Sequence, residues 1–136
     1  MELQSGAIKH GDLYKLKVRW NGGEGERIPA WANRVVQDEQ TKIFSAQVWE
    51  PENPYRFRKK VFRAKTDPLM IYECHIGMAQ EEERVGTYNE FREKILPRIA
   101  EAGYNCIQIM AIQEHPYYGS FGYHVSSFFA PSSRFG

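Results

Sequence analysis

The chain lacks the features that mark membrane, secreted and nucleic-acid-binding proteins. No apolar run approaches the roughly 20 residues of a membrane-spanning helix, and residues 1–12 contain neither an apolar segment nor a cleavage signature for secretion. The 18 Lys and Arg residues nearly balance the 17 Asp and Glu residues, so the net charge of +1 provides no bulk field toward nucleic acid or a membrane surface. We therefore expect a cytoplasmic protein that binds neither nucleic acid nor membrane.

Cysteines and convergent metal ligands are also scarce. The two cysteines, Cys74 and Cys106, fall in predicted buried strands that can be neighbours, but free thiols are favoured over a disulfide in a cytosolic protein. The histidines are scattered, and only His115 and His124 share a predicted loop. Because a zinc site needs three or four convergent ligands, we expect neither a metal nor another cofactor.

Aromatic residues, in contrast, are abundant. They make up 14% of the 136 residues, with eight Tyr, eight Phe and three Trp. Such richness fits carbohydrate contact, but a β-rich core gives the same count and is the interpretation that we favour. We expect at least two of Trp20, Trp31 and Trp49 to fill space between strands. The alternative is that the three indoles form a glucan-stacking platform.

The first half of the chain is typical of antiparallel β structure without helices. Residues 13–20 alternate between apolar and basic side chains, which predicts a half-buried strand. Residues 21–25 supply the glycines of a hairpin turn. Residues 27–38 contain a proline that removes a ladder donor, so they form an edge, a bulge or a short excursion. Residues 42–49 predict another strand, and residues 55–62 predict either a final short strand or an extended linker.

The second half predicts a strand–helix–strand unit. The apolar runs at 69–76 and 106–112 are typical of parallel strands that are buried on both faces. Between them, residues 77–86 predict a loop with an acidic solvated surface, and residues 87–102 predict an amphipathic helix. Two parallel strands joined by a helix form a βαβ unit with a right-handed crossover.

Three local signals define the predicted helix. Thr87 and Glu90 have the spacing of a capping box, in which each side chain satisfies a free backbone donor of the other. Pro97 lies inside the apolar stripe and removes a backbone hydrogen bond, so we expect a kink or a restart there. Gly103 is placed to end the helix as its C′ residue.

Polar groups in the first predicted parallel strand raise a separate possibility. Glu73 and His75 lie on one strand face, where such a pair can perform acid–base chemistry. The interpretation that we favour is a hydrogen-bonded polar group packed at a domain edge, because buried polar side chains are usually satisfied in this way.

The candidate binding site is the segment that follows the second parallel strand. Glu114, His115 and Pro116 lead into a loop at 117–124 that is dense in tyrosine, phenylalanine and glycine. Ligand sites of α/β proteins usually lie just past the carboxyl ends of parallel strands. Flat aromatic faces bind the apolar faces of sugars, and glycines allow a backbone to pass close by. The loop is therefore a candidate sugar site.

Three stretches carry a resemblance to a known family. They read RIPAWANRVVQD, IYECHIGM and LPRIAEAGYNCIQIMAIQEHPYYGSFGYHVSSFFAPSSRFG. In sequence and order, residues 27–136 resemble the 1,4-α-glucan (glycogen or starch) branching enzymes of the α-amylase superfamily. Related hydrolases and debranching enzymes share the βαβ beginning, but the first and third stretches together favour the branching class.

The resemblance implies a mixed α+β fold in two parts. Residues 1–60 would be the last antiparallel strands of a β-sandwich carbohydrate-binding module, and residues 61–68 a linker. Residues 69–136 would be the first βαβ unit, with its following loop, of the catalytic (β/α)8 barrel. A barrel of this type takes about 250 residues, so we expect this chain to represent a piece of such an enzyme.

The resemblance also implies substrate contacts. The family's tyrosine that stacks on the glucose unit at the cleavage point corresponds to Tyr123, and the alternative is a buried loop tyrosine. His124 would contact a sugar hydroxyl, and Tyr118 would also contact substrate. The implied partner is an α-glucan such as glycogen, amylose or amylopectin.

The implied chemistry is retaining transglycosylation, which needs two carboxyl groups about 5 Å apart across the scissile bond. All aspartates of the chain precede the predicted parallel strands, and Glu114 is the sole carboxylate after the second one. The family does not use such a residue as nucleophile or acid, so we assign no catalytic residue. We expect the chain alone to be inactive. We also expect it to bury its unpaired strand edges by self-association, by domain rearrangement or by folding back onto the β module. The alternative function is a non-catalytic α-glucan-binding module.

Overall fold

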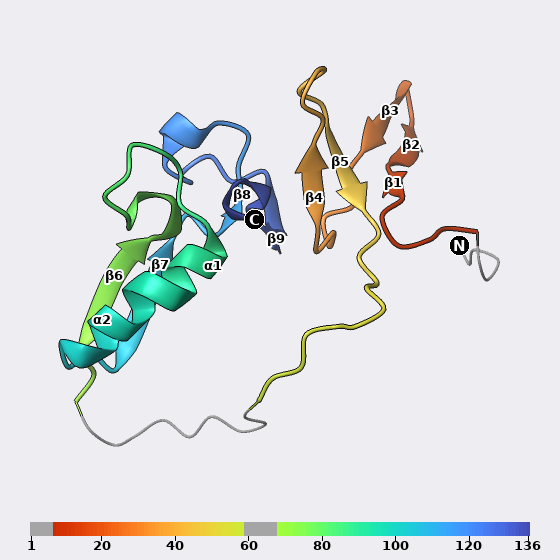
Figure 1. Cartoon of the computed structure of the whole chain (residues 1–136). Coiled ribbons are helices and arrows are strands. Elements are labelled where there is room, and N and C mark those ends of the chain that lie inside the picture. Colours follow the sequence, from red (N-terminus) through yellow and green to blue (C-terminus); the bar gives the residue numbers. More distant parts are fainter. Residues whose placement is uncertain (1–6, 59–67) are drawn as a thin grey trace. The chain divides into compact units, whose positions relative to one another are not determined.

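The computed structural model describes residues 7–58 and 68–136, and it divides the chain into two compact units. Unit 1 comprises Met1–Pro51 with Ala111–Ser133, and unit 2 comprises Glu52–Met110 with Arg134–Gly136 (Figure 1). The predicted linker and the end of the predicted segment 55–62 lie almost entirely outside the described residues, and residues 55–58 form no strand. The two units thus group residues 111–133 with the N-terminal strands, whereas the domain boundaries at 60 and 68 stay a prediction.

Unit 1 consists of short antiparallel strands. They are β1 (Leu13–Tyr14), β2 (Leu16–Trp20), β3 (Gly23–Arg27), β4 (Val35–Gln37), β5 (Phe44–Gln47), β8 (Gln113–Glu114) and β9 (Ser127–Pro131). They form a three-stranded sheet of order β1-β5-β4 and two hairpins, β2-β3 and β8-β9. The antiparallel character, the hairpin turn and the strand within 42–49 are confirmed.

The prediction of one half-buried strand over 13–20 was wrong in two respects. The strand is broken at Lys15, so that β1 pairs with β5 while β2 pairs with β3. Every residue of β2 is exposed. The physical reason is the partner strand, because the sequence of β3 is Gly-Glu-Gly-Glu-Arg and offers no apolar face against which β2 can form a core.

The core of unit 1 is built mainly from small side chains. Its buried residues are Ala32, Val35, Ala46 and Ala130, and three larger residues pack against them: Tyr14, Ile28 and Phe44. Ala130 comes from β9, which is why the segment after β7 belongs to this unit.

The expectation that at least two tryptophans fill space between strands was also wrong. Trp20, Trp31 and Trp49 are 49%, 76% and 49% exposed. A core lined by alanines leaves little space for an indole, so the three rings lie on the surface. Trp31 stacks on Phe129 with 4.4 Å between ring centroids, and the Arg34 guanidinium lies 4.0 Å from the Trp49 ring.

Unit 2 contains a parallel strand pair and the helical segment that connects it. Strands β6 (Ile71–His75) and β7 (Cys106–Met110) pair in parallel, with Cys74 opposite Ile109. The predicted strand–helix–strand unit is therefore confirmed, whereas its place in a barrel stays a prediction. Burial on both faces was a wrong expectation, because Ile71 and Tyr72 are exposed where only two strands form the described sheet. Both cysteines are free, as expected.

The helical segment has three parts: α1 (Tyr88–Glu90), the π-helical η2 (Phe91–Ile95) and α2 (Leu96–Glu101). The capping box is confirmed, since Thr87 Oγ1 accepts from the Glu90 N–H and Glu90 accepts from the Thr87 N–H. The predicted restart is also confirmed: the π turn ends immediately before α2, which carries Pro97 in its first turn, where a missing N–H costs little. Gly103 ends the segment with φ +93°.

Candidate functional site

The candidate site is the loop at 115–126, which the hairpin β8-β9 closes at its base. Gln113 lies opposite Pro131 and Glu114 lies opposite Ser127, with a bulge between the two pairs. The Glu114 carbonyl accepts hydrogen bonds from the Ser126 N–H at 2.8 Å and from the Ser126 hydroxyl at 3.1 Å. The two ends of the loop are therefore joined directly within unit 1.

The Glu114 carboxylate also stabilises this hairpin, through its side chain. It is fully buried, and its Oε2 accepts from the Ser133 N–H at 2.7 Å, while Oε1 accepts from the His115 N–H at 3.1 Å and lies 3.5 Å from the Ser132 hydroxyl. A buried carboxylate that accepts backbone donors is satisfied without a counter-ion. Glu114 is thus a structural anchor, and no local pattern in the sequence signals these contacts with residues 18 and 19 positions away.

His115 is buried beside this anchor. Its ring Nδ1 lies 2.9 Å from the Gln113 carbonyl oxygen, which assigns the Nδ1–H as the donor in that contact. His124, in contrast, is exposed. The two histidines that share the loop therefore differ in environment, and the described residues contain no group of three His, Cys, Asp or Glu side chains that could hold a metal ion.

The interior of the loop is a tight coil. The 3-10 turn η3 (Tyr118–Ser120) begins it, and the Ser120 N–H and hydroxyl both donate to the Tyr117 carbonyl, at 3.0 and 2.7 Å. Phe121 and Gly122 then adopt left-handed backbone conformations with φ +50° and +80°. The Tyr123 N–H donates back to the Ser120 carbonyl at 3.0 Å, so successive turns fix the course of the chain up to Tyr123.

The structure places the three predicted substrate residues on this coil. Tyr123 is 80% exposed, which leaves its ring available to a ligand. His124 follows it and is exposed, and Tyr118 is half-buried with its ring 6.4 Å from that of Phe121. Sequence reasoning found the segment and its glycines, but it missed Ala111 and its contact with Gly122 directly before Tyr123.

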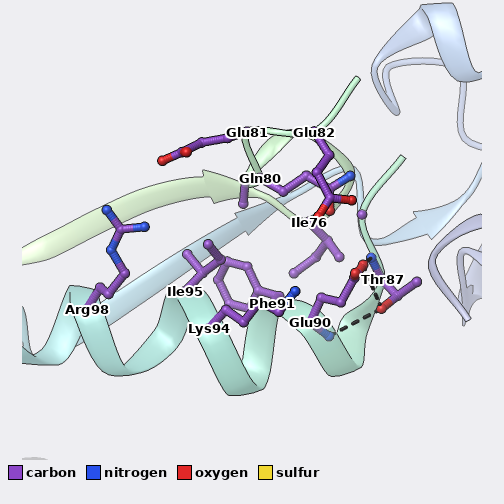
Figure 2. A pocket seen from close by; sticks show the side chains of 12 residues that line it. Ile76, Gln80, Glu81, Glu82, Thr87, Glu90, Phe91, Lys94, Ile95 and Arg98 are labelled. Atoms are coloured by element: carbon purple, nitrogen blue, oxygen red, sulfur yellow. Dashed lines mark hydrogen bonds between the residues drawn. The ribbon is translucent and has the colours of Figure 1, made fainter. Parts of the chain in front are cut away.

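Unit 2 carries a separate pocket with a volume of about 280 Å³. Figure 2 shows Phe91, Lys94, Ile95 and Arg98 on the helix facing a loop that carries glutamates. The residues that line this pocket lie in the loop between β6 and α1 and in the helical segment, and they include none of the predicted substrate residues. The pocket is therefore not part of the candidate sugar site.

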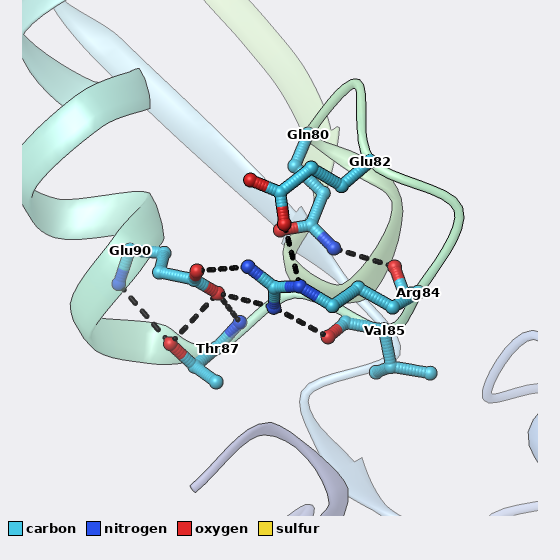
Figure 3. Close-up of polar contacts among 6 residues, drawn as sticks. All are labelled: Gln80, Glu82, Arg84, Val85, Thr87 and Glu90. Atoms are coloured by element: carbon cyan, nitrogen blue, oxygen red, sulfur yellow. Dashed lines mark hydrogen bonds and ion pairs between the residues drawn. The ribbon is translucent and has the colours of Figure 1, made fainter.

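An ion-pair network fixes that loop to the helix (Figure 3). Arg84 donates to both carboxylate oxygens of Glu90 and to Glu82 at 2.6 Å, and Gln80 donates to the Arg84 carbonyl. The Arg84 hydrogen bonds, with those of Thr87, lower the pKa of Glu90 to about 2, and Glu90 in turn raises the pKa of Arg84. The Glu90 carboxylate thus serves both the capping box and the loop.

The predicted Glu73–His75 pair is not a catalytic arrangement. Glu73 is exposed, whereas His75 is buried and lies edge-on to Phe135, with ring centroids 5.6 Å apart. This finding supports the packing interpretation of His75. Burial, with a contribution from Glu73, also raises the pKa of the adjacent Cys74 thiol, which disfavours a reactive thiolate.

Among the described residues, no helix is both long and apolar enough to cross a membrane. This finding agrees with the lack of a long apolar run in the sequence.

Comparisons with known proteins place the chain among named relatives. No family model matches it. It is 47% identical to a 1,4-alpha-glucan-branching enzyme of Dictyostelium discoideum over 96% of the chain and 19% of that protein. Identity is also 47% to the enzyme of that name from Saccharomyces cerevisiae, over 96% of the chain and 20% of that protein, and 46% to a chloroplastic/amyloplastic one of Arabidopsis thaliana, over 97% and 16%. Over nearly its whole length, therefore, this chain is similar to 1,4-alpha-glucan-branching enzymes, and it spans about one fifth of their length.

Proposed function

We propose that the chain supplies one wall of the α-glucan site of a 1,4-α-glucan-branching enzyme. The observation that carries this proposal is the exposed Tyr123 ring on a loop whose ends and interior are held by hydrogen bonds. The names of the relatives support an α-1,4-linked glucan as the ligand. An exposed aromatic face on a fixed loop can stack on the apolar face of a glucose ring at a low entropic cost.

The proposed roles of the site residues follow from their chemistry. Tyr123 stacks on the glucose unit next to the cleaved bond. His124 follows it on the exposed side of the loop and hydrogen-bonds a sugar hydroxyl. Tyr118 is half-buried, so only part of its ring is available to border the same sugar chain.

The whole enzyme would cleave an α-1,4 linkage and transfer the glucan chain to a 6-hydroxyl. Retaining transfer of this kind requires a nucleophilic carboxylate and a second carboxyl group that protonates the leaving oxygen. Glu114, in β8, is fully buried and its carboxylate accepts from backbone donors, so it can fill neither role. We therefore propose binding and positioning, without catalysis, for this chain alone.

The architecture proposed for the whole enzyme extends the two units. The antiparallel strands β1 to β5 of unit 1 support their assignment to the end of a β-sandwich carbohydrate-binding module. The parallel pair β6-β7 with its helix supports an assignment to the first βαβ unit of a (β/α)8 barrel. In the chain alone, the outer edges of β6 and β7 have no partner strand among the described residues, and we propose that they self-associate.

The cytoplasm is the proposed location, although the name of the Arabidopsis relative assigns that protein to plastids. A fusion of the chain's parent protein to a fluorescent reporter tests this proposal. Plastid fluorescence in a plant host would contradict it.

The function is tested by electrophoresis through gels that contain amylose. Replacement of Tyr123 by alanine removes one stacking contact and should weaken retardation about tenfold in apparent dissociation constant. The matched control is Tyr55→Ala, since Tyr55 is 77% exposed but lies outside the loop. Equal retardation of the Tyr123→Ala variant and the unchanged chain would contradict the proposal.

A second candidate function is a non-catalytic α-glucan-binding module. The observation that favours it is the exposure of Trp31, which is 76% exposed although its ring lies 4.4 Å from that of Phe129. Replacement of Trp31 by alanine in the same gels separates the two candidates. Loss of retardation with Trp31→Ala but not with Tyr123→Ala would favour the module.

A further inference from the structure

We propose that Gly122 is a positioning residue, whose close contact with Ala111 sets the orientation of Tyr123 toward the glucan. This inference rests on the proposed function only for the identity of the ligand. Its structural part concerns two backbone positions within unit 1: Ala111 directly after β7, and Gly122 directly before Tyr123.

The contact leaves no space for a side chain on Gly122. A Cβ atom at this position would lie 2.3 Å from the Ala111 Cβ and 2.4 Å from the Ala111 Cα, both far inside van der Waals contact. One of these atoms belongs to the backbone, so rotation of a side chain cannot relieve the overlap. A Cβ on Gly122 would therefore have to push the turn that carries Tyr123 away from Ala111.

Both partners also hold unusual backbone conformations. Ala111 has φ +55° and Gly122 has φ +80°, and Phe121 between the turn and Gly122 has φ +50°. Left-handed backbone at a non-glycine residue costs free energy and persists only where surrounding contacts enforce it. Of these two non-glycine residues, Ala111 lies in the contact itself and Phe121 directly precedes Gly122. Enforced left-handed backbone on both sides of Gly122's contact is the pattern expected of a positioning device.

Gly119 provides a matched control three residues earlier in the same loop. A Cβ there would also be crowded, at 2.4 Å from the Tyr117 hydroxyl oxygen, but that atom is the far end of an exposed and rotatable side chain. Gly119 has no left-handed φ, so alanine fits its backbone. Gly119→Ala should displace the Tyr117 ring and leave the Tyr123 turn in place.

The first test is ¹⁹F NMR of the full chain labelled with 3-fluorotyrosine, in which Tyr123→Phe assigns the Tyr123 resonance. Gly122→Ala should shift or split that resonance and leave the Tyr14 and Tyr72 resonances unchanged. Gly119→Ala should move the Tyr117 resonance alone. An unchanged Tyr123 resonance in Gly122→Ala, or an equal change in Gly119→Ala, would overturn the inference.

If Gly122→Ala does not fold, the same NMR measurement is made on Ala111→Gly. This variant removes a methyl group from the contact and suits the left-handed φ of position 111, so the chain should fold. The loosened contact should broaden or shift the Tyr123 resonance. A resonance identical to that of the unchanged chain would again overturn the inference.

The second test separates positioning from a general loss of structure. Affinity for maltoheptaose is measured for Gly122→Ala, Tyr123→Ala and the double variant. If Gly122 acts through Tyr123, its replacement weakens binding several-fold in the unchanged chain and has no further effect in the Tyr123→Ala background. If Tyr123→Ala binds maltoheptaose more weakly but Gly122→Ala binds it as well as the unchanged chain does, the inference is contradicted and the proposed function is not. An unchanged affinity of Tyr123→Ala for maltoheptaose would contradict the proposed function and, with it, the claim that Gly122 positions Tyr123 for a glucan. The NMR result then decides whether Gly122 sets the orientation of Tyr123.

Discussion

Replacement of Glu114 by glutamine tests how firmly the 115–126 loop is tied to its hairpin. In the native chain, one carboxylate oxygen accepts from the Ser133 N–H at 2.7 Å and the other from the His115 N–H at 3.1 Å. Glutamine has the same shape but keeps only one acceptor oxygen, because its other end is an NH₂ donor. In either orientation of the amide, one buried backbone N–H faces a donor.

The expected cost follows from these two hydrogen bonds. Bonds to a charged acceptor contribute about 1.5–3 kcal/mol each, and a buried donor without an acceptor costs about 1–3 kcal/mol. Burial of a neutral amide is cheaper than burial of a carboxylate, which offsets part of this loss. We therefore expect Glu114→Gln to lower the free energy of unfolding by about 2 kcal/mol.

Urea unfolding followed by tryptophan fluorescence measures this change, since Trp31 stacks on Phe129 of β9 in the same unit. Amide hydrogen exchange at Ser126 and Ser133 reports the two backbone N–H groups that donate to the Glu114 carbonyl and carboxylate. The matched control is Glu39→Gln, an exposed carboxylate in unit 1, which should leave stability within about 0.5 kcal/mol. If Glu114→Gln behaves like this control in both measurements, the assignment of Glu114 as an anchor is refuted.

Three further predictions concern the helical segment of unit 2. Thr87→Ala removes the N-cap acceptor and should lower the free energy of unfolding by about 1 kcal/mol, as urea unfolding measures. Thr87→Ser keeps the acceptor and should retain most of that free energy. Equal stability of the two variants would contradict the capping role of Thr87. Because the folded pKa of Glu90 is about 2, below its ordinary 4.5, its stabilisation is complete above pH 4.5 and is lost as the pH falls toward 2. Arg84→Ala should raise that pKa toward 4.5 in a ¹³C NMR titration, and an unmoved pKa would refute the role of Arg84. Gly103→Ala places a Cβ in open space but at φ +93°. Through backbone strain alone it should lower the free energy of unfolding by about 1 kcal/mol. An unchanged free energy in urea unfolding would contradict that strain.

Local signals in the sequence predicted the local structure well. The capping box at Thr87, the restart at Pro97 and the end at Gly103 depend on residues within one or two helical turns of each other. The parallel pairing of β6 and β7 followed from two apolar runs separated by a helix. The helix signals need no knowledge of distant contacts, and the strand pairing follows from the general rule for strand–helix–strand units.

Features that depend on the side chains of a distant partner could not be predicted. The alternation at 13–20 indicates a strand, but it cannot tell that β3 offers no apolar face and leaves Trp20 exposed. The sequence predicted no catalytic role for Glu114, but its anchoring role depends on Ser133, 19 residues away, and has no local signal.

The candidate site shows the same division. The segment was found because aromatic residues and glycines crowd it, whereas Tyr123 itself was singled out by the resemblance to the branching enzymes. The structure places Tyr123 on an exposed turn. The left-handed conformation of Ala111 has no sequence signal, since alanine rarely adopts it and only the meeting with Gly122 explains it. Backbone packing between two loop ends is a property of the folded chain that no local pattern of residues predicts.

Binding of an α-1,4-linked glucan by the Tyr123 loop is the proposal on which the assigned function depends. Isothermal titration of the full chain with maltoheptaose tests this binding, with the Tyr123→Ala and Tyr55→Ala variants measured alongside. We expect saturable binding that weakens about tenfold in Tyr123→Ala and stays unchanged in Tyr55→Ala. Binding that is identical in all three proteins, or absent from the unchanged chain, would contradict the proposal.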